Sequence, residues 1–258
     1  MTVLELAGRA LAISLLLIAS KAGASSVSIS DNLLVLSNSD RSGQIELLSM
    51  TSDAKEFTLA LDELPDGVKD GREFLRWGPK RIRVPANRGR PMRAVFRPPA
   101  DLDPGEYVVR LRVKSVDAGG DGMSRNGTGE GELGEGVGAS VGIQPVLPIT
   151  IYMRHKVESP ELEITEFIAS PDDDNRYGYF TAAKAPDAIS YIGTVLLEGA
   201  DSGQTYTSGR LRLGQTSNET RINVPKRGDD SPLEEAVCLK VWNEFPAKGR
   251  ADQTVCSD

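Results

Sequence analysis

The most regular pattern of apolar and polar positions in the chain lies between Val137 and Ile151, where every odd position is apolar. A period of two is typical of an extended strand with one apolar face. We therefore expect a strand over 137–154. Its alternating part, from 137 to 151, would by itself extend about 50 Å. Strands of globular domains are usually about 3–10 residues long, so a single sandwich cannot pair all of it. The odd positions are Val137, Ala139, Val141, Ile143, Pro145, Leu147, Ile149 and Ile151, and the polar or small even positions include Gly138, Ser140, Gly142, Gln144 and Thr150.

Two prolines, Pro145 and Pro148, place this strand at the edge of a sheet, because proline has no N–H to give to a strand ladder. Long apolar edges are normally protected by charge, and this one carries none from Val137 to Met153. Two interpretations follow: a single long core strand with a proline bulge, or an edge kept available for another polypeptide.

Short alternating segments separated by turn residues fill most of the remaining chain and predict an all-β protein built from β-sandwiches. The turn-prone stretch 38–43 predicts a hairpin between its flanking strands. A short polar junction, His155 to Pro160, contains the expected boundary between domains at 25–155 and 156–258. The expected strands are 27–30, 33–37, 44–48, 56–61, 74–77, 82–84, 90–97 and 106–114 in the first domain and 162–168, 177–181, 189–197, 205–213, 220–224 and 236–242 in the second.

A glycine-rich segment, 117–136, precedes the alternating strand and contains almost no apolar residues. Glycine loses more backbone entropy on ordering than any other residue, so we expect a flexible loop. A loop of this length inside a compact domain is either functional or merely tolerated.

The composition of 258 residues, 39% apolar and 26% charged, is that of a globular protein with two ordinary domains. The net charge of −7 argues against nucleic acid or an anionic membrane as the main partner. Basic residues nevertheless cluster between Arg72 and Arg97, where we interpret them as a solvated strand face.

The N-terminal residues 1–24 have the pattern of a cleaved secretory signal. Arg9 precedes an apolar run, Ala10 to Ala19, which is too short to span a bilayer, and Ala22-Gly23-Ala24 supplies a small-x-small cleavage site. We expect an exported mature chain that begins near Ser25 and does not insert into the membrane. An uncleaved anchor is the alternative.

The chain has two cysteines, Cys238 and Cys256. Export to an oxidising compartment favours a disulfide between them, which would close a loop of about 18 residues and contribute roughly 3 kcal/mol. A redox pair is disfavoured because the Cys-x-x-Cys spacing is absent.

Catalytic and metal-binding motifs are missing from the sequence, so we expect neither an enzyme nor a bound metal or cofactor. His155 is the single histidine, and no G-x-S-x-G, Walker or zinc-ligand spacing is present. Residue type alone does not exclude a hydrolase that uses a pair of carboxylates, because carboxylates are plentiful. The run Asp172-Asp173-Asp174-Asn175 could gather calcium through its oxygens, but a solvated turn is the favoured interpretation.

Several motifs in the first domain resemble the PapD-like periplasmic chaperones of the chaperone–usher pilus pathway. The most specific is Pro99-Ala100-Asp101-Leu102-Asp103-Pro104-Gly105-Glu106-Tyr107, which is similar to the family's turn before a strand. Gly78 to Val84, Arg93 to Pro99 and Ile149 to Arg154 match further family patterns. The resemblance covers residues 27–155 well and the second half by length and strand style.

The resemblance implies two immunoglobulin-like sandwiches and a non-enzymatic role in pilus assembly in the periplasm. The last strand of the first domain would be lent to an incomplete pilus subunit, the strand-addition mode known for chaperone–pilin complexes. The subunit would then pass to an outer-membrane usher. Carried over by position, Val137, Ala139, Val141 and Ile143 would enter the subunit, and Ile149 and Ile151 would belong to the home core.

The sequence departs from the family at the two basic residues that commonly anchor a subunit's C-terminal carboxylate. The aligned positions are Leu33 and Thr150, and neither is basic. Arg154 is the nearest cation and the candidate substitute.

An alternative from a different class of protein fits the same pattern. A secreted structural or adhesive surface protein made of two sandwiches could use 137–151 as a self-paired or polymerising strand. Neighbouring genes for an usher and small subunits would favour the chaperone, and stable homopolymers would favour the surface protein.

Overall fold

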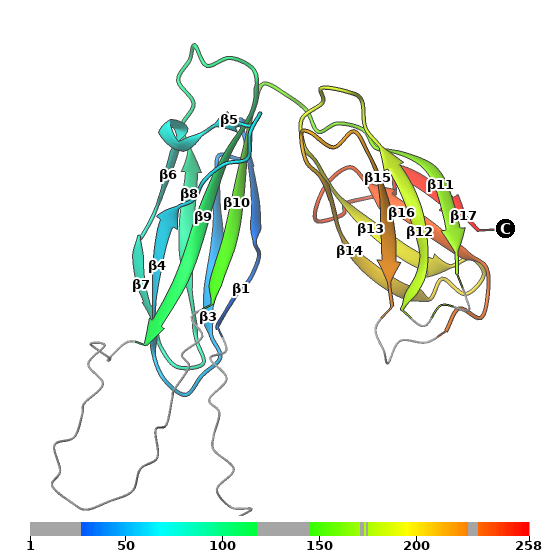
Figure 1. The fold of residues 1–258 in the computed structure, drawn as a ribbon, viewed down its shortest axis with the longest axis horizontal. Helices are drawn as coiled ribbons and strands as arrows, with labels where there is room; N and C mark the ends of the chain where they lie inside the picture. The colour runs from blue at the N-terminus through cyan, green and yellow to red at the C-terminus, as the bar shows by residue number, and fades with distance from the viewer. Residues whose placement is uncertain (1–26, 118–144, 171–172, 174, 227–231, 258) are drawn as a thin grey trace, which may run out of the picture.

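A computed structural model describes residues 27–117, 145–170, 173, 175–226 and 232–257, and it contains two β-sandwiches (Figure 1). The first sandwich packs a four-stranded sheet against a six-stranded sheet. The four-stranded sheet has the order β1 (Val27–Ile29), β3 (Ser42–Ser49), β8 (Gly89–Phe96) and β6 (Leu75–Gly78). The six-stranded sheet has the order β2 (Leu33–Ser37), β10 (Val146–His155), β9 (Gly105–Asp117), β4 (Lys55–Leu61) and β7 (Arg81–Val84), with β5 (Lys69–Asp70) beside β9.

The second sandwich is formed by a three-stranded and a four-stranded sheet, and both are antiparallel. The smaller sheet has the order β11 (Glu163–Ala169), β12 (Arg176–Ala183) and β15 (Glu219–Pro225). The larger has the order β14 (Thr205–Leu213), β13 (Tyr191–Gly199), β16 (Val237–Trp242) and β17 (Gln253–Cys256).

The core of the first sandwich follows directly from the period of two. On β9, Tyr107, Val109, Leu111 and Val113 are buried in this core, while the positions between them lie on the opposite face of the sheet. Burying each such side chain contributes about 1.5–3 kcal/mol. The core is completed by Leu36, Ile45, Leu47, Phe57, Leu59, Leu75, Ile82, Val84, Met92, Ala94, Phe96, Ile149, Ile151 and Met153.

The Pro-Gly-Glu-Tyr turn that leads into β9 has two structural tasks. The Tyr107 hydroxyl donates to the carbonyl of Asp103 at 2.9 Å, four residues upstream, which is the tyrosine-corner contact of immunoglobulin-like sandwiches. Gly105 adopts a φ of 152°, in a region that favours glycine. The turn thereby fixes the start of β9 and the position of Glu106, which lies between the two.

The predicted hairpin at 38–43 is wrong. The chain does turn there, with the Ser37 amide donating to the carbonyl of Asp40 at 2.8 Å. However, β2 and β3 belong to opposite sheets, and Leu36 and Ile45 enter the same core from its two sides. β2 instead pairs in parallel with β10. The short strands β5 and β17 were not predicted, because two and four residues with little burial leave no periodic signal.

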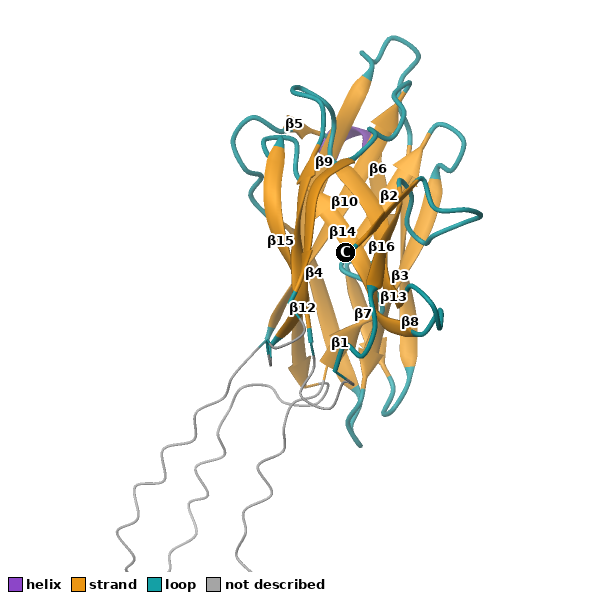
Figure 2. Cartoon of the chain, turned by 90° about the vertical axis from the view of Figure 1, so that its right-hand side faces the viewer, coloured by secondary structure: helices purple, strands orange, loops and turns teal. Residues whose placement is uncertain are grey.

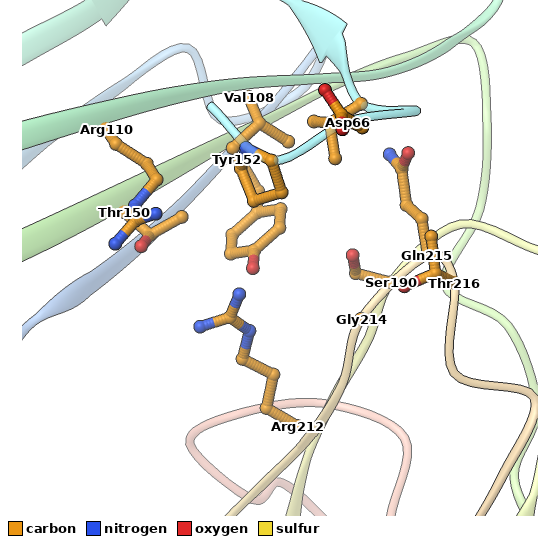
Figure 3. A pocket seen from close by; sticks show the side chains of 12 residues that line it. Asp66, Val108, Arg110, Thr150, Tyr152, Ser190, Arg212, Gly214, Gln215 and Thr216 are labelled. Atoms are coloured by element: carbon orange, nitrogen blue, oxygen red, sulfur yellow. The ribbon is translucent and has the colours of Figure 1, made fainter. Parts of the chain in front are cut away.

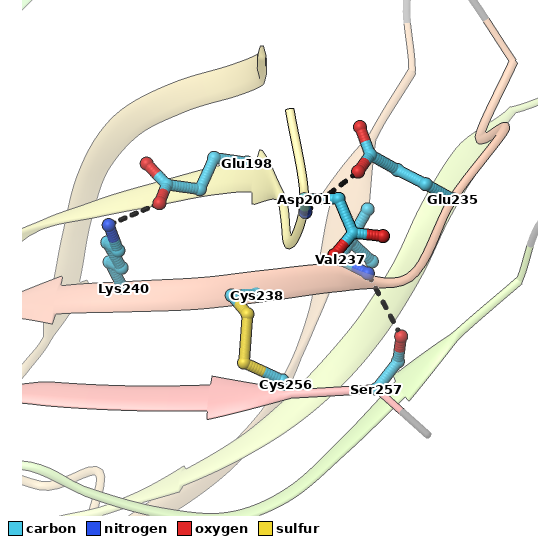
Figure 4. The surroundings of a disulfide bond; sticks show 8 residues. All are labelled: Glu198, Asp201, Glu235, Val237, Cys238, Lys240, Cys256 and Ser257. Atoms are coloured by element: carbon cyan, nitrogen blue, oxygen red, sulfur yellow. Dashed lines mark hydrogen bonds and ion pairs between the residues drawn. A yellow bond between two sulfur atoms is a disulfide. The ribbon is translucent and has the colours of Figure 1, made fainter. Parts of the chain in front are cut away.

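The cysteines form a disulfide between neighbouring strands of the second sandwich (Figure 4). Cys238 and Cys256 are register partners on β16 and β17. The Val237 amide donates to the Ser257 hydroxyl at 3.1 Å, and Lys240 forms an ion pair with Glu198 on β13. The C-terminal strand is therefore attached to the sheet by a covalent bond as well as by its ladder.

Strands and loops make up nearly all of the described chain (Figure 2). The helical structure of these residues is one 3-10 turn, η1 (Arg72–Phe74). Within the described ranges, no helix has the length and apolar character needed to cross a membrane.

Candidate functional site

Strand β10 has one half that is paired on both sides and one half with a free edge. It pairs with β9 along its whole length, from Val146 to His155. Its other side pairs with β2 only from Thr150 to Arg154. Among the described strands, none pairs with that side of Val146 to Ile149. The side chain of Val146 is 50% exposed, whereas Ile149 is fully buried.

The expected edge position is found for Val146 to Ile149, whereas Thr150 to Arg154 lies between β2 and β9 and is interior. Ile149 and Ile151 both lie in the core of the first sandwich, as expected. The predicted donor residues Val137, Ala139, Val141 and Ile143 lie outside the described residues. So do residues 118–136 of the glycine-rich segment and the expected signal at 1–24.

A buried carboxylate, Glu106, connects the two sandwiches. Its Oε2 accepts from Nε of Arg154 at 3.0 Å, and its Oε1 accepts from the Ser190 amide at 3.0 Å. Nε2 of Gln215, in the loop after β14, donates to the same Oε1 at 3.1 Å. Glu106 is 1% exposed, so these donors replace the water that its charge has lost.

Arg154, the predicted carboxylate anchor, is a structural link in this molecule. Besides Glu106, its guanidinium donates to the Ser190 carbonyl at 2.7 Å and to the Ser159 hydroxyl at 2.5 Å. The residue is 6% exposed. A partner's carboxylate would have to displace Glu106 to reach it, so the position of Arg154 gives that role no support.

Apolar and charged contacts on either side of Glu106 extend the contact between the sandwiches. Leu33, Val108 and Tyr152 from the first sandwich pack with Ile192 from β13 in one buried cluster. Arg210 on β14 forms an ion pair with Asp31, next to the start of β2. A buried lysine, Lys184, stabilises the loop that carries Gln215, because its Nζ donates to the Gln215 carbonyl at 3.2 Å.

Beside this contact lies a cavity of about 260 Å³, lined from both sandwiches (Figure 3). Arg110 of β9 and Arg212 of β14 both line it, as does one acidic residue, Asp66. Figure 3 shows the Tyr152 hydroxyl directed toward the Arg212 guanidinium, whose carbon lies 5.2 Å from the centre of the tyrosine ring. Burial raises the pKa of Tyr152, so its hydroxyl keeps its proton and can donate.

Thr150, one of the two uncharged positions noted in the sequence, lines this cavity together with two arginines. Leu33, Thr150 and Arg110 form one row across β2, β10 and β9, since Thr150 is the register partner of both others. Leu33 and Thr150 are uncharged, as expected, but Arg110 lies next to Thr150 on the same face. Neither Arg110 nor Arg212 forms an ion pair within the described residues, so both guanidinium groups can bind an anion.

Sequence reasoning missed Arg110 and Arg212 as site residues for different reasons. Arg110 has the alternation of an outward strand residue, which normally indicates a solvated face. Arg212 is about 60 residues beyond Thr150 in the chain, and only the packing of the two sandwiches brings them to one cavity.

His155, the single histidine, ends β10 and is 3% exposed. Neither of its ring nitrogens has a hydrogen-bond partner, and its ring centre lies 6.3 Å from that of Phe96. Burial lowers the pKa of His155, and the nearby charges of Lys156 and Arg41 lower it further. The imidazole is a neutral core group with no access to a substrate.

The acidic run before β12 has local partners where the structure describes it. Asp173 accepts hydrogen bonds from the Asn175 amide at 2.9 Å and from Nε of Arg176 at 2.7 Å. The hydrogen bond from the Asn175 amide is the main cause that lowers the pKa of the Asp173 carboxyl. Asp172 and Asp174 lie outside the described residues. Within the described ranges, no group of three or more potential metal ligands occurs.

Comparison with known proteins gives a result for solved structures alone. No protein-family model matches the chain. No curated protein matches it by sequence. A structure of the Salmonella enterica SafA pilin in complex with the SafB chaperone matches 90% of this chain and 95% of its own, with a TM-score of 0.47 and 12% identity.

Two further solved structures cover nearly the same part of the chain. The YadV chaperone matches 90% of this chain and 99% of its own, with a TM-score of 0.45 and 13% identity. The E. coli chaperone DraB matches 91% of this chain and 98% of its own, with a TM-score of 0.45 and 10% identity.

We predict that Arg154→Met destabilises the protein and loosens the contact between the sandwiches. The substitution leaves the Glu106 carboxylate buried without its cation, a change that typically costs about 3–5 kcal/mol. Urea unfolding measures the loss of stability, and small-angle X-ray scattering measures the change in the distance between the sandwiches.

The matched control for this prediction is Arg72→Ala, which removes an exposed ion pair with Asp70 and should leave the stability nearly unchanged. The double variant Glu106→Gln/Arg154→Met removes the uncompensated charge and should recover part of the loss. An Arg154→Met protein as stable as Arg72→Ala would contradict the assigned role of Glu106.

We also predict that the protein loses stability as the pH falls through 6.5, the ordinary pKa of histidine. The folded state lowers the pKa of His155, so in that range the unfolded chain binds the proton more readily and acid favours unfolding. Urea unfolding at about pH 7.5 and about pH 5.5 measures the difference. In His155→Gln, which cannot be protonated, the difference should shrink. An unchanged difference would assign the acid sensitivity to carboxylates instead.

Proposed function

We propose that this protein is a periplasmic chaperone that binds pilus subunits by strand donation and passes them to an outer-membrane usher. The observation that carries the proposal is the free edge on Val146 to Ile149, which opens beside the cavity between the sandwiches. The turn motif before β9 and the export pattern at 1–24 also support a periplasmic chaperone. Similarly arranged proteins include chaperones, one of them solved together with a pilin.

Strand addition suits the chemistry of this edge. A chain that pairs with Val146 to Ile149 would satisfy backbone groups that β2 leaves unpaired. Upstream, the side chains at 137, 139, 141 and 143 continue the apolar face for insertion into an incomplete subunit. Each large apolar side chain so buried would contribute about 1.5–3 kcal/mol. Ordering a glycine-rich approach costs about 1–2 kcal/mol per residue, so binding requires a preformed groove in the partner.

Arg110 and Arg212 are our candidates for the anchor of the subunit's C-terminal carboxylate. They line the cavity next to Thr150, where the family's basic residues are absent. Arginine presents a fork of donors that matches a carboxylate, and the Tyr152 hydroxyl offers a third donor. Asp66 on the far side partly offsets their charge and would disfavour a second anion.

The rival function is a structural or adhesive surface protein that polymerises through the same edge. It would use the free side of β10 equally well but has no need of cations in the cavity. Size-exclusion chromatography of the mature protein distinguishes the two, since polymers would favour the rival and a monomer that recruits a pilus subunit would favour the chaperone.

Ile143→Arg should abolish co-purification with a co-expressed pilus subunit while leaving the chaperone folded, because it places a charge in the partner's groove. Ile149→Arg is the matched control: Ile149 is fully buried in the home core, so this variant should unfold. Pull-down measures binding, and circular dichroism measures folding. Unfolding of Ile143→Arg would show that the strand is internal at that position.

Arg110→Ala and Arg212→Ala should each weaken binding of a peptide copied from a subunit's C-terminal strand by about tenfold, because each removes a charged hydrogen bond. The effect should disappear when the peptide's carboxylate is replaced by an amide. Arg221→Ala removes an arginine that stacks on Tyr179 outside the cavity and serves as the control. Isothermal titration calorimetry gives the affinities. Equal losses for acid and amide peptides would contradict the anchor.

A further inference from the structure

The outer face of the six-stranded sheet carries a column of cations along β9. Arg110, Arg112 and Lys114 alternate with the buried Leu111 and Val113, so all three point away from the core. Alternate residues of a strand lie about 6.5–7 Å apart, and the column therefore repeats at that spacing. Its upper end is Arg110, which also lines the cavity between the sandwiches.

A second pair of cations lies on the same face at the far edge of the sheet. Arg81 of β7 is opposite Thr58 of β4, which in turn is opposite Lys114. Arg83 of β7 is opposite Glu56 of β4. The face thus carries basic residues on two strands with the mostly short side chains of β4 between them.

Two carboxylates neutralise only part of this charge. Glu56 accepts from Nε of Arg81 at 2.7 Å, and Asp62 lies 4.0 Å from Nη1 of Arg112, at the limit of an ion pair. Within the described residues, no ion pair involves Lys114 or the arginines at 83 and 110. A protein with a net charge of −7 therefore keeps unpaired cations together on one sheet face.

The column lies one strand away from the free edge of β10. A chain that pairs with Val146 to Ile149 would be separated from β9 by two strand spacings, roughly 10 Å. Between them, the outward side chains of β10 are those of Val146 and Pro148, which are short. Arg112 and Lys114 are the register partners of Pro148 and Val146, so their long side chains can extend across β10 toward the added chain.

We propose that this face selects partner segments in which acidic and apolar side chains alternate. The acidic side chains of the added strand would face Arg112 and Lys114, because alternate side chains have the same spacing along the added strand as along β9. The inference rests on the strand-donation function proposed above and adds a preference among partners. The occupant is a polypeptide because its alternate side chains have the same spacing as the column, and because the face is continuous with the free edge.

The test uses the mature full-length protein and synthetic peptides of about ten residues. Valine occupies alternate positions, and aspartate, serine or lysine occupies the others. All C-termini are amidated, so that the carboxylate anchor does not contribute. Fluorescence anisotropy at low and high salt measures binding, because screening weakens exposed ion pairs.

We expect the aspartate peptide to bind roughly three- to tenfold more tightly than the serine peptide at low salt, as two or three exposed ion pairs would produce. The lysine peptide should bind more weakly than the serine peptide. In the variant Arg112→Gln/Lys114→Gln the preference for aspartate should be lost, while the serine peptide binds as before. Arg93→Gln, at an exposed position on the other sheet, should change nothing.

Each other outcome has a definite meaning. Equal binding of the aspartate and serine peptides would overturn the preference and leave strand donation intact. Failure of all three peptides to bind would overturn this inference, because the free edge would then not pair with a separate strand. The proposed function would still be decided by co-purification with a pilus subunit, which offers a preformed groove. Anionic lipid vesicles that bind the wild type and not the double variant would assign the face to a membrane surface and overturn the inference.

Discussion

The structure depends on one buried carboxylate. Glu106 is placed by the turn before β9, is removed from water, and accepts from Arg154, the Ser190 amide and Gln215. Such a charge is tolerated in the interior only while its donors stay in position. Since those donors come from both sandwiches, the solvation of Glu106 fixes how the sandwiches meet, and that contact creates the cavity beside it.

The cavity and the free edge of β10 are neighbours along the strand. Thr150 lines the cavity and directly follows the free edge, because β2 starts to pair with β10 there and Arg110 lies on its other side. The basic column of β9 extends the same surface away from the cavity. This surface is locally positive although the net charge of the chain is negative. The net charge is therefore a poor guide to the electrostatics at the place where a partner would bind.

Much of the fold could be predicted from the sequence, because alternation reports which face of a strand is buried. The strand over Leu33–Ser37 and that over Thr205–Leu213 were predicted with their observed bounds. The pairing of β2 could not be predicted, since a local turn signal does not say which sheet the next strand joins. The roles of Arg110 and Arg154 could not either: both look like solvated cations until the second sandwich covers one and leaves the other open.

The position at which β2 begins has a mechanical consequence. A chain that pairs with β10 from Val146 onward meets β2 at Leu33 and cannot pair further without displacing β2 from the sheet. The start of β2 therefore limits how many residues of a partner can pair with this edge. A polypeptide added to this edge would end beside Ile149, because Leu33 occupies that side of Thr150, so the molecule would bind the end of a chain rather than a segment within it.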